Sequence, residues 1–518
     1  MERRTKELSG LDKEAGHKNN THYLVDVPVE NEKGTKMKKD IGILKAVSII
    51  FGVIVGSGIF VSPVGVLKYT NSVGLSMVMW LIPGLFSILG ALVYAELGVR
   101  IPKSGGEFIY VLQAFGGLPA FLVMWITFVI IGSVSCAANS LVFAQYILYP
   151  FYPSCEIPNH VLLMVAVVGL MLIAAVNACK VSWATNIAVV FSFAKFSALL
   201  LIIGFGLYSL CMGSVDNFNE PFANSNTSPG SLALAFYQGF WAFSGWSYLN
   251  FLVEEMKNPS RDLPLAISIA LTLVTILYIF TNVAYLAVLS PYELLQSQSE
   301  SVVVAIIFAE RVMPWFVAVM PILVGASVFG SINGEFLSIS RLTYSGAREG
   351  HMPSLLALIH YRSLTPIPAI LVLLLLSVGF QMYEDILYLI ELAGFAFSLI
   401  AALAVMSLIY LRVKEPNVIS AFQLPLIFPI FFLLCDLFIL GLTVYQQPWE
   451  SFLNILIILA AIPIYFTCVY WQHPQNIRSK IHYVTVTLQK VLSCVQPDPE
   501  VVEASVTDDK TPSQVKKK

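Results

Sequence analysis

The sequence has little charge for its length. Of its 518 residues, only 12% are Asp, Glu, Lys or Arg, whereas 57% are hydrophobic. An ordinary soluble domain carries about twice that share of charged residues. This chain therefore lacks the polar surface that a soluble protein of its size needs, and we predict a polytopic membrane protein. The 30 basic residues nearly balance the 32 acidic ones, which leaves no basic field for binding nucleic acid.

The sequence also lacks the motifs of soluble enzymes and metal centres. It contains no G-x-x-x-x-G-K-[ST] loop, no G-x-S-x-G elbow, no H-E-x-x-H helix and no paired C-x-x-C. We expect no enzymatic activity, no cofactor and no metal ion. We expect no cleavable signal peptide, because about 40 largely polar residues precede the first apolar run. The first span is therefore expected to act as the insertion signal.

Long apolar runs are what the sequence does have. Runs of about 20 residues can span a bilayer, and they predict an all-α membrane fold with about twelve transmembrane helices. The predicted spans are residues 42–68, 74–97, 117–149, 160–179, 184–211, 231–254, 264–290, 314–345, 367–383, 387–411, 423–445 and 450–471. The run at 314–345 fits one long helix or two pieces. An even number of spans places both termini on one side.

Basic residues are confined almost entirely to one side of these spans. The two tails and every second loop carry 26 Lys and Arg, whereas the opposite side has only Lys68 and Arg311, and Lys45 and Lys195 fall inside spans. Cytoplasmic loops retain basic residues, so we predict that both termini are cytoplasmic.

Three regions follow from this pattern. Residues 1–40 are predicted to be a disordered cytoplasmic tail, 41–472 the transmembrane domain, and 473–518 a second cytoplasmic tail. Within the second tail, residues 476–495 resemble an amphipathic segment lying on the inner leaflet, although a flank without function fits equally well.

Two of the predicted spans contain sequences that interrupt a helix. Glycine weakens a helix by about 1 kcal/mol relative to alanine and leaves the backbone open to a ligand. The interrupting stretches are residues 52–60 of the first span and 241–247 of the sixth. The first and sixth spans are five helices apart, which is an odd number. Two five-helix units, about 42–211 and 231–411, therefore enter the membrane from opposite sides, which predicts an inverted repeat followed by two helices at about 423–471.

Unwound helices inside a membrane expose backbone groups that only a cavity lining tolerates. A zwitterionic amino acid suits such ends, because a helix N-terminus binds a carboxylate and a C-terminus offers carbonyls to an ammonium. The carboxylate is predicted to accept from the N–H groups of Ser57, Gly58 and Ile59. The ammonium is predicted to donate to carbonyls around Val53, Ile54, Trp241, Ala242 and Ser244. Close helix packing through Gly52 and Gly56 is the alternative explanation.

Lys195, Glu391, Glu335 and Asp436 are notable among the ionisable residues within predicted spans. Lys195, in the fifth, costs at least about 2.5–3.5 kcal/mol in a membrane and should face a cavity or a partner. Our hypothesis is that its ammonium takes the place that a sodium ion holds in a sodium-coupled relative. Glu391, near the outer end of the tenth span, is expected to reach water. Glu335 and Asp436 are expected to be neutral or paired, and we assign them no role.

One cysteine differs from the rest. Most of the seven fall in predicted helices or on the cytoplasmic side, where thiols stay reduced, but Cys155 lies in the short outer segment 152–158. An unpaired external thiol favours a disulfide to another chain. An inert thiol or a bridge to Cys211 are the alternatives.

With these features, the sequence resembles the light, transport-competent subunits of the heteromeric amino-acid transporters, in the amino acid/polyamine/organocation superfamily. The resemblance runs from about Ile41 to Pro497. Its most specific stretches are residues 56–63, 94–98, 103–107, 155–158, 249–255 and 348–353. The resemblance implies a LeuT-like fold, sodium-independent obligatory exchange of amino acids, and a place in the plasma membrane.

The resemblance also implies residue roles. Cys155 matches the cysteine that bonds a single-span glycoprotein heavy chain, and Lys195 matches the lysine that replaces a sodium site. Ser57 and Gly58 match the carboxylate-binding turn, and Trp241 matches the aromatic residue that closes over substrate from outside. The expected substrate site consists of Val53, Ile54, Gly56, Ser57, Gly58, Ile59, Trp241, Ala242, Phe243, Ser244, Gly245 and Phe397.

Departures from the family pattern narrow the substrate. The cystine/glutamate exchanger carries arginines where this chain has Gly132 and Phe397, and the cystine and dibasic amino-acid transporter has an acidic residue where this chain has Ser244. At these positions the chain has no oppositely charged residue for a substrate whose side chain is anionic or cationic. Uncharged substrates are therefore predicted. Phe243, Trp246 and Phe397 favour large or aromatic ones, although aromatic residues also pack in cores.

Alternating access between the two sides is the predicted mechanism. Two other functions fit the sequence. One is a uniporter or proton-coupled carrier, with Glu391 as a possible proton carrier. The other is a membrane scaffold that binds the heavy chain without transporting.

Overall fold

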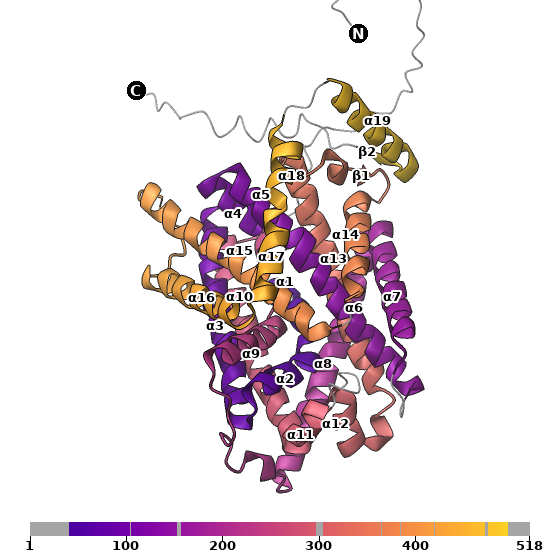
Figure 1. Ribbon diagram of the computed structural model, residues 1–518, viewed down its shortest axis with the longest axis vertical. Helices are drawn as coiled ribbons and strands as arrows, with labels where there is room; N and C mark the ends of the chain where they lie inside the picture. The colour runs from indigo at the N-terminus through magenta and orange to yellow at the C-terminus, as the bar shows by residue number, and fades with distance from the viewer. Residues whose placement is uncertain are drawn as a thin grey trace, which may run out of the picture. The chain divides into compact units, whose positions relative to one another are not determined.

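The computed structural model describes residues 41–495, apart from 104, 153–156, 297–303, 364, 384, 419 and 472–474 (Figure 1). Both predicted tails largely lie outside the described residues, as do Cys155 and Pro497. The elements of the first half are α1 (Ile43–Ile54), α2 (Gly58–Thr70), α3 (Val73–Arg100), α4 (Gly106–Phe115), α5 (Gly117–Trp125), the π-helix η1 (Ile126–Gly132), α6 (Ser133–Leu148), η2 (Tyr149–Phe151), α7 (Asn159–Cys179), α8 (Val181–Cys211) and η3 (Asp216–Phe218).

The second half of the chain also consists mainly of helices. Its elements are α9 (Pro229–Ala242), the 3-10 helix η4 (Trp246–Glu255), α10 (Pro259–Val288), α11 (Pro291–Gln296), α12 (Val304–Val312), η5 (Pro314–Phe316), α13 (Met320–Arg348), η6 (Ser354–Ala357), β1 (Ile359–His360), α14 (Ile367–Gln381), α15 (Ile386–Lys414), α16 (Ile427–Gln446), α17 (Pro448–Leu459), α18 (Ala461–Tyr465), the π-helix η7 (Phe466–Tyr470), α19 (Gln475–Leu492) and β2 (Cys494–Val495).

The prediction of an all-α membrane protein is confirmed. In the described part of the chain, nine helices are long and apolar enough to cross a bilayer, and α1 with α2 forms a tenth span bent by 51°. The shorter α14 and the interrupted pair of α9 and η4 occupy the remaining two predicted spans. The run at 314–345 is two pieces, because η5 and α13 each begin with a proline in the first turn, where its missing N–H costs nothing.

The broken helices lie among the long ones. The first break packs against many helices, since α2 contacts α9 while α1 contacts α10, α13 and α8. Figure 1 places α11 and α12 at one end of the transmembrane unit and α4, β1 and α19 at the opposite end, which we call the α12 end and the α4 end. The sequence predicts the α4 end to be cytoplasmic, because the basic loops belong to it.

Two features at the α4 end join segments far apart in the chain. β1 pairs antiparallel with β2, so that His360 lies opposite Cys494 and the residues after α19 are held against the loop after α13. The fully buried carboxylate of Glu96 in α3 pairs with Arg412 of α15, whose Nε lies 2.8 Å from Oε1. Burying both charges is tolerable because they compensate each other. α19 covers most of the predicted amphipathic segment, and its position on a membrane stays a prediction.

Candidate substrate site

The first span is interrupted where the glycines predict it. α1 ends at Ile54 and α2 begins at Gly58, with Ser57 as the residue before its first turn. Among the described residues, no side chain caps this N-terminus, so the first N–H groups of α2 lack an intrahelical acceptor. A Cβ at Gly56 would come within 2.7 Å of Ser331 Oγ, and one at Gly58 would collide with the backbone of Ala242. The glycines thus permit the break and also the close packing that was the alternative explanation.

The sixth span is interrupted opposite the first. α9 ends at Ala242, and the chain turns through Gly245, whose φ of +100° suits glycine, before η4 begins. The Ser244 N–H donates to the Trp241 carbonyl at 2.9 Å, so one of the carbonyls predicted for the ammonium already has a partner. The Ile54 carbonyl likewise accepts from the Tyr278 hydroxyl at 3.1 Å. A carbonyl oxygen has two lone pairs, so each keeps capacity for a second donor.

Lys195 reaches the end of α1 from α8. Its Nζ donates to the Gly52 carbonyl at 2.6 Å and to Ser331 Oγ at 2.8 Å, and the residue is only 1% exposed. The ammonium therefore lies at the C-terminal end of α1, where the helix dipole is negative and a cation is favoured. Snorkelling to a membrane surface is excluded by these contacts.

On the other side of the break, Ser57 begins a chain of buried polar groups. Its hydroxyl donates to Asn139 Oδ1 of α6, and Asn139 Nδ2 donates to Glu335 Oε1 of α13 at 3.1 Å. The same carboxyl group accepts from Ser135 Oγ at 2.6 Å and, more weakly, from Cys136 Sγ at 3.4 Å. Glu335 was expected to be either neutral or paired, and these hydrogen bonds pair it. The sequence offers no sign of these partners.

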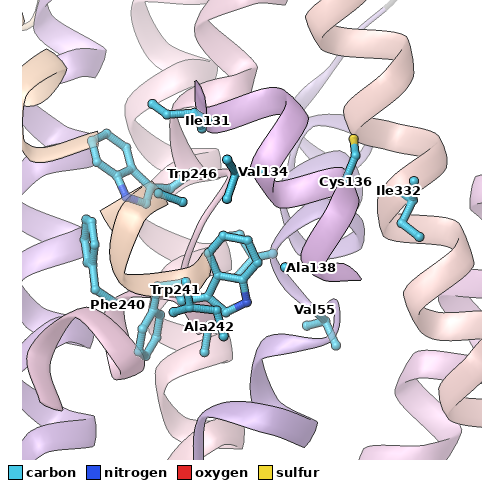
Figure 2. Packing of buried hydrophobic residues seen from close by; sticks show 14 of the residues in the cluster. Val55, Ile131, Val134, Cys136, Ala138, Phe240, Trp241, Ala242, Trp246 and Ile332 are labelled. Carbon is cyan, nitrogen blue, oxygen red and sulfur yellow. The ribbon is translucent and has the colours of Figure 1, made fainter. Parts of the chain in front are cut away.

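Aromatic residues surround the second break. Figure 2 shows Trp241 and Trp246 on the two sides of the turn, with Phe240 beside them and Ile131 and Val134 nearby. A cavity beside the turn between α9 and η4 is lined by Ile131, Phe240, Trp241, Ser244, Trp246, Ala393, Gly394 and Phe397. A second one, of about 350 Å³ including its open part, shares Ile131, Ser244 and Phe397 with the first and extends to Glu107 of α4.

The remaining predicted site residues divide into two groups. Gly245 lies against Val53, so the second break touches the end of α1, whereas Gly56 faces Ser331 of α13 and Ile59 is fully buried in α2. Phe243 is different, because its fully buried ring packs against Trp80 and Tyr278, with ring centroids at 6.5 and 5.2 Å. Its ring is therefore directed into the helix packing of α3 and α10, away from the cavity-lining side chains.

Acidic residues outside the breaks are more enclosed than their positions in the sequence indicate. Glu391 is only 6% exposed and accepts from Tyr69 at 2.5 Å, Gln238 at 3.1 Å and Gln447 at 3.1 Å. The expectation that it reaches water is wrong, because α2, α9 and the residue before α17 supply donors around it. At the cavity's α4 end, burial raises the pKa of Glu107 to about 7 against the opposing effect of its hydrogen bonds.

Comparison with known proteins agrees with this geometry. The model of one family, described as amino acid permease, matches residues 41–480. The chain belongs to the amino acid permease family. Among the curated relatives of this permease, the human cystine/glutamate transporter is 41% identical over 469 residues, covering 90% of this chain and 93% of the relative.

Two further human relatives match over similar lengths. The large neutral amino acids transporter small subunit 2 is 41% identical over 486 residues, covering 92% of this permease and 89% of the relative. The Asc-type amino acid transporter 1 is 42% identical over 449 residues, covering 86% and 85%. All three names describe transporters, so the permease is a transport protein and not an enzyme.

Proposed function

We propose that this permease is a sodium-independent exchanger of neutral amino acids and the transport subunit of a disulfide-linked pair in the plasma membrane. The observation that carries the proposal is the meeting of two broken helices, where the uncapped N-terminus of α2 packs against the end of α9. The relatives named for cystine/glutamate, large neutral amino acids and Asc-type transport support the amino-acid part.

The two breaks supply complementary charges to an amino acid. The carboxylate binds the N–H groups at the start of α2, where the helix dipole is positive. The ammonium donates to carbonyls at the ends of α1 and α9, and the side chain enters the cavity of Ile131, Ser244 and Phe397. Trp241, 9% exposed and lining that cavity, closes over the substrate. Gly56, Gly58 and Gly245 let the backbone approach closely enough for these contacts.

Two sets of contacts support the proposed sodium independence and the proposed conformational state. The Lys195 ammonium holds α1 to α13 as a bound sodium ion would, so no sodium is required. The Glu391 hydrogen bonds join α2, α9, α15 and the start of α17 near the α12 end, while the cavity extends toward α4. These contacts support a state closed at the α12 end, and we propose that alternating access exchanges this closure for one at the α4 end.

Exchange is tested with the permease and its heavy chain reconstituted into vesicles. Labelled leucine uptake should require unlabelled leucine inside the vesicles and should be unchanged when sodium is replaced by choline. Uptake into empty vesicles at the same rate would support the uniporter instead. Concentrative uptake driven by a pH gradient alone would support the proton-coupled carrier, and absence of uptake under every condition would support the scaffold.

The partner is proposed to be a single-span glycoprotein bonded through Cys155, which lies outside the described residues. Non-reducing electrophoresis should show a heavier species that disappears in Cys155→Ser and persists in the control Cys211→Ser, whose thiol is exposed. Loss of the species in the control but not in Cys155→Ser would contradict the assignment. We expect Cys155→Ser to keep appreciable transport, because folded interfaces do not depend on one bridge.

A further inference from the structure

A buried carboxyl group lies two hydrogen bonds from the turn that is proposed to bind substrate. Glu335 is 9% exposed and receives hydrogen bonds from Ser135, Asn139 and Cys136, and Asn139 in turn accepts from Ser57. All three groups donate to it. A protonated carboxyl group would itself need an acceptor, so these three donors and the charge of Lys195 favour the ionised form against the opposing effect of burial.

The same helix faces continue into the cavity. Glu335 precedes Ile339 by one turn of α13, and Ser135 follows Ile131 by about one turn of the span formed by α5, η1 and α6. Residues one turn apart share a helix face, and both isoleucines line the cavity. The hydrogen-bonded group of Glu335, Ser135 and Asn139 therefore lies about one helix turn from the cavity lining, and Asn139 links it to the start of α2 through Ser57. A substrate that binds with its carboxylate at α2 and its side chain in the cavity therefore lies close to this group.

Lys195 and Glu335 interact electrostatically, but they contact opposite sides of the first break. The Lys195 ammonium binds the Gly52 carbonyl on the α1 side of the break, whereas Glu335 reaches Ser57 on the α2 side. The pair is neutral as a whole, which makes burying both charges tolerable. Each charge still acts most strongly on the groups closest to it, because the Coulomb energy falls with distance.

We infer that Glu335 is the charge-selecting residue of the substrate site. Its negative charge disfavours an amino acid whose side chain carries a carboxylate and favours one whose side chain carries a cation, so the site accepts basic amino acids as well as neutral ones. The inference rests on the proposed function and extends it, because neither Ser244 nor Phe397 can supply that charge.

Competition against labelled leucine exchange tests it in cells that co-express the heavy chain. Two pairs of competitors differ mainly in charge: lysine with norleucine, and glutamate with glutamine. For the natural chain, lysine should inhibit at least as well as norleucine, and glutamine about tenfold better than glutamate. In Glu335→Gln, inhibition by lysine should become about tenfold weaker relative to norleucine. The difference in inhibition between glutamine and glutamate should shrink by a similar factor, since removal of one nearby unit charge has effects of this order.

Matched variants distinguish an effect of the Glu335 charge from an effect of misfolding. Glu335→Asp should keep the order of the natural chain, and Asp436→Asn, which removes another buried acidic group in α16, should leave both ratios unchanged. Leucine exchange normalised to surface protein reports whether each variant is folded.

The outcomes are distinct. If lysine competes far less well than norleucine in the natural chain, the inference is overturned whether or not Glu335→Gln reaches the surface. The same holds if Glu335→Gln exchanges leucine with unchanged ratios. Absence of leucine exchange by the natural chain would overturn the proposed function itself and the inference with it.

Discussion

The two helix breaks are built from opposite kinds of side chain. Charged and hydrogen-bonding groups hold the first one, with Lys195 on the α1 side and the group of Ser57, Asn139 and Glu335 on the α2 side. Aromatic rings hold the second, where Trp246 packs edge-on against Phe397 with centroids 5.6 Å apart. Hydrogen bonds fix positions and directions, whereas apolar contacts adapt to different shapes.

This difference assigns separate tasks to the two breaks. The first recognises what all amino acids share, because its geometry is fixed by directional bonds. The second sorts side chains and closes over them, because ring packing can change with little loss of hydrogen bonding. Variants of the two breaks should therefore fail in different ways, the first in exchange as a whole and the second in which substrates are exchanged.

The largest effect is expected at the polar break. Lys195→Met removes the donor to the Gly52 carbonyl and Ser331, which frees the end of α1 and leaves buried acceptors without a partner, at about 1–3 kcal/mol for each. Leucine exchange per surface molecule should fall at least about tenfold, as a loss of 1.4 kcal/mol implies. Lys180→Met, an exposed lysine just before the same helix, is the control and should keep full activity. Normal exchange by Lys195→Met would mean that the ammonium does not hold the break.

A smaller effect is expected at the aromatic break. Trp241→Ala removes the ring that closes the cavity, so the apparent KM for leucine should rise about tenfold, since full burial of a large apolar side chain contributes about 1.5–3 kcal/mol. Trp241→Phe retains an aromatic ring and should recover most of the affinity. Measured uptake at several leucine concentrations distinguishes the two. An unchanged KM in Trp241→Ala would place the closure elsewhere.

The smallest effect is a change of substrate ranking. Phe397→Ala enlarges the cavity, and tryptophan should then compete severalfold better relative to leucine, because one methylene in an apolar pocket is worth about 1–3 kcal/mol. Phe243→Ala is the contrasting variant. It should lower stability by about 3–5 kcal/mol, as large core truncations do, without changing the ranking. Competition ratios together with thermal unfolding of the purified complex test both. A changed ranking in Phe243→Ala would return that ring to the substrate site.

The sequence predicted much of this arrangement because its signals are local. Gly56, Gly58 and Gly245 mark the breaks by residue type alone, and the depth of Lys195 in an apolar run requires a buried partner. Span lengths follow from membrane thickness, so most boundaries fall within a few residues of the prediction.

What the sequence did not reveal depends on contacts between distant segments. Asn139 and Glu335 are 196 residues apart, and Glu391 meets Tyr69 across 322 residues. The sequence marks Glu335 and Glu391 as ionisable residues within spans, but it does not show which side chains they meet. Phe243 was assigned to the site by its place in the sixth span, yet the direction of its ring depends on how the chain turns between α9 and η4.

The central claim is that the main chain at the two breaks binds both charged ends of a free amino acid. It is tested most directly by competing labelled leucine exchange with leucinamide, which lacks the carboxylate, and with N-acetyl-leucine, which lacks the ammonium, while free leucine serves as the reference. The account predicts that neither derivative inhibits at concentrations where leucine inhibits completely. Inhibition by either one comparable to that of leucine would contradict it.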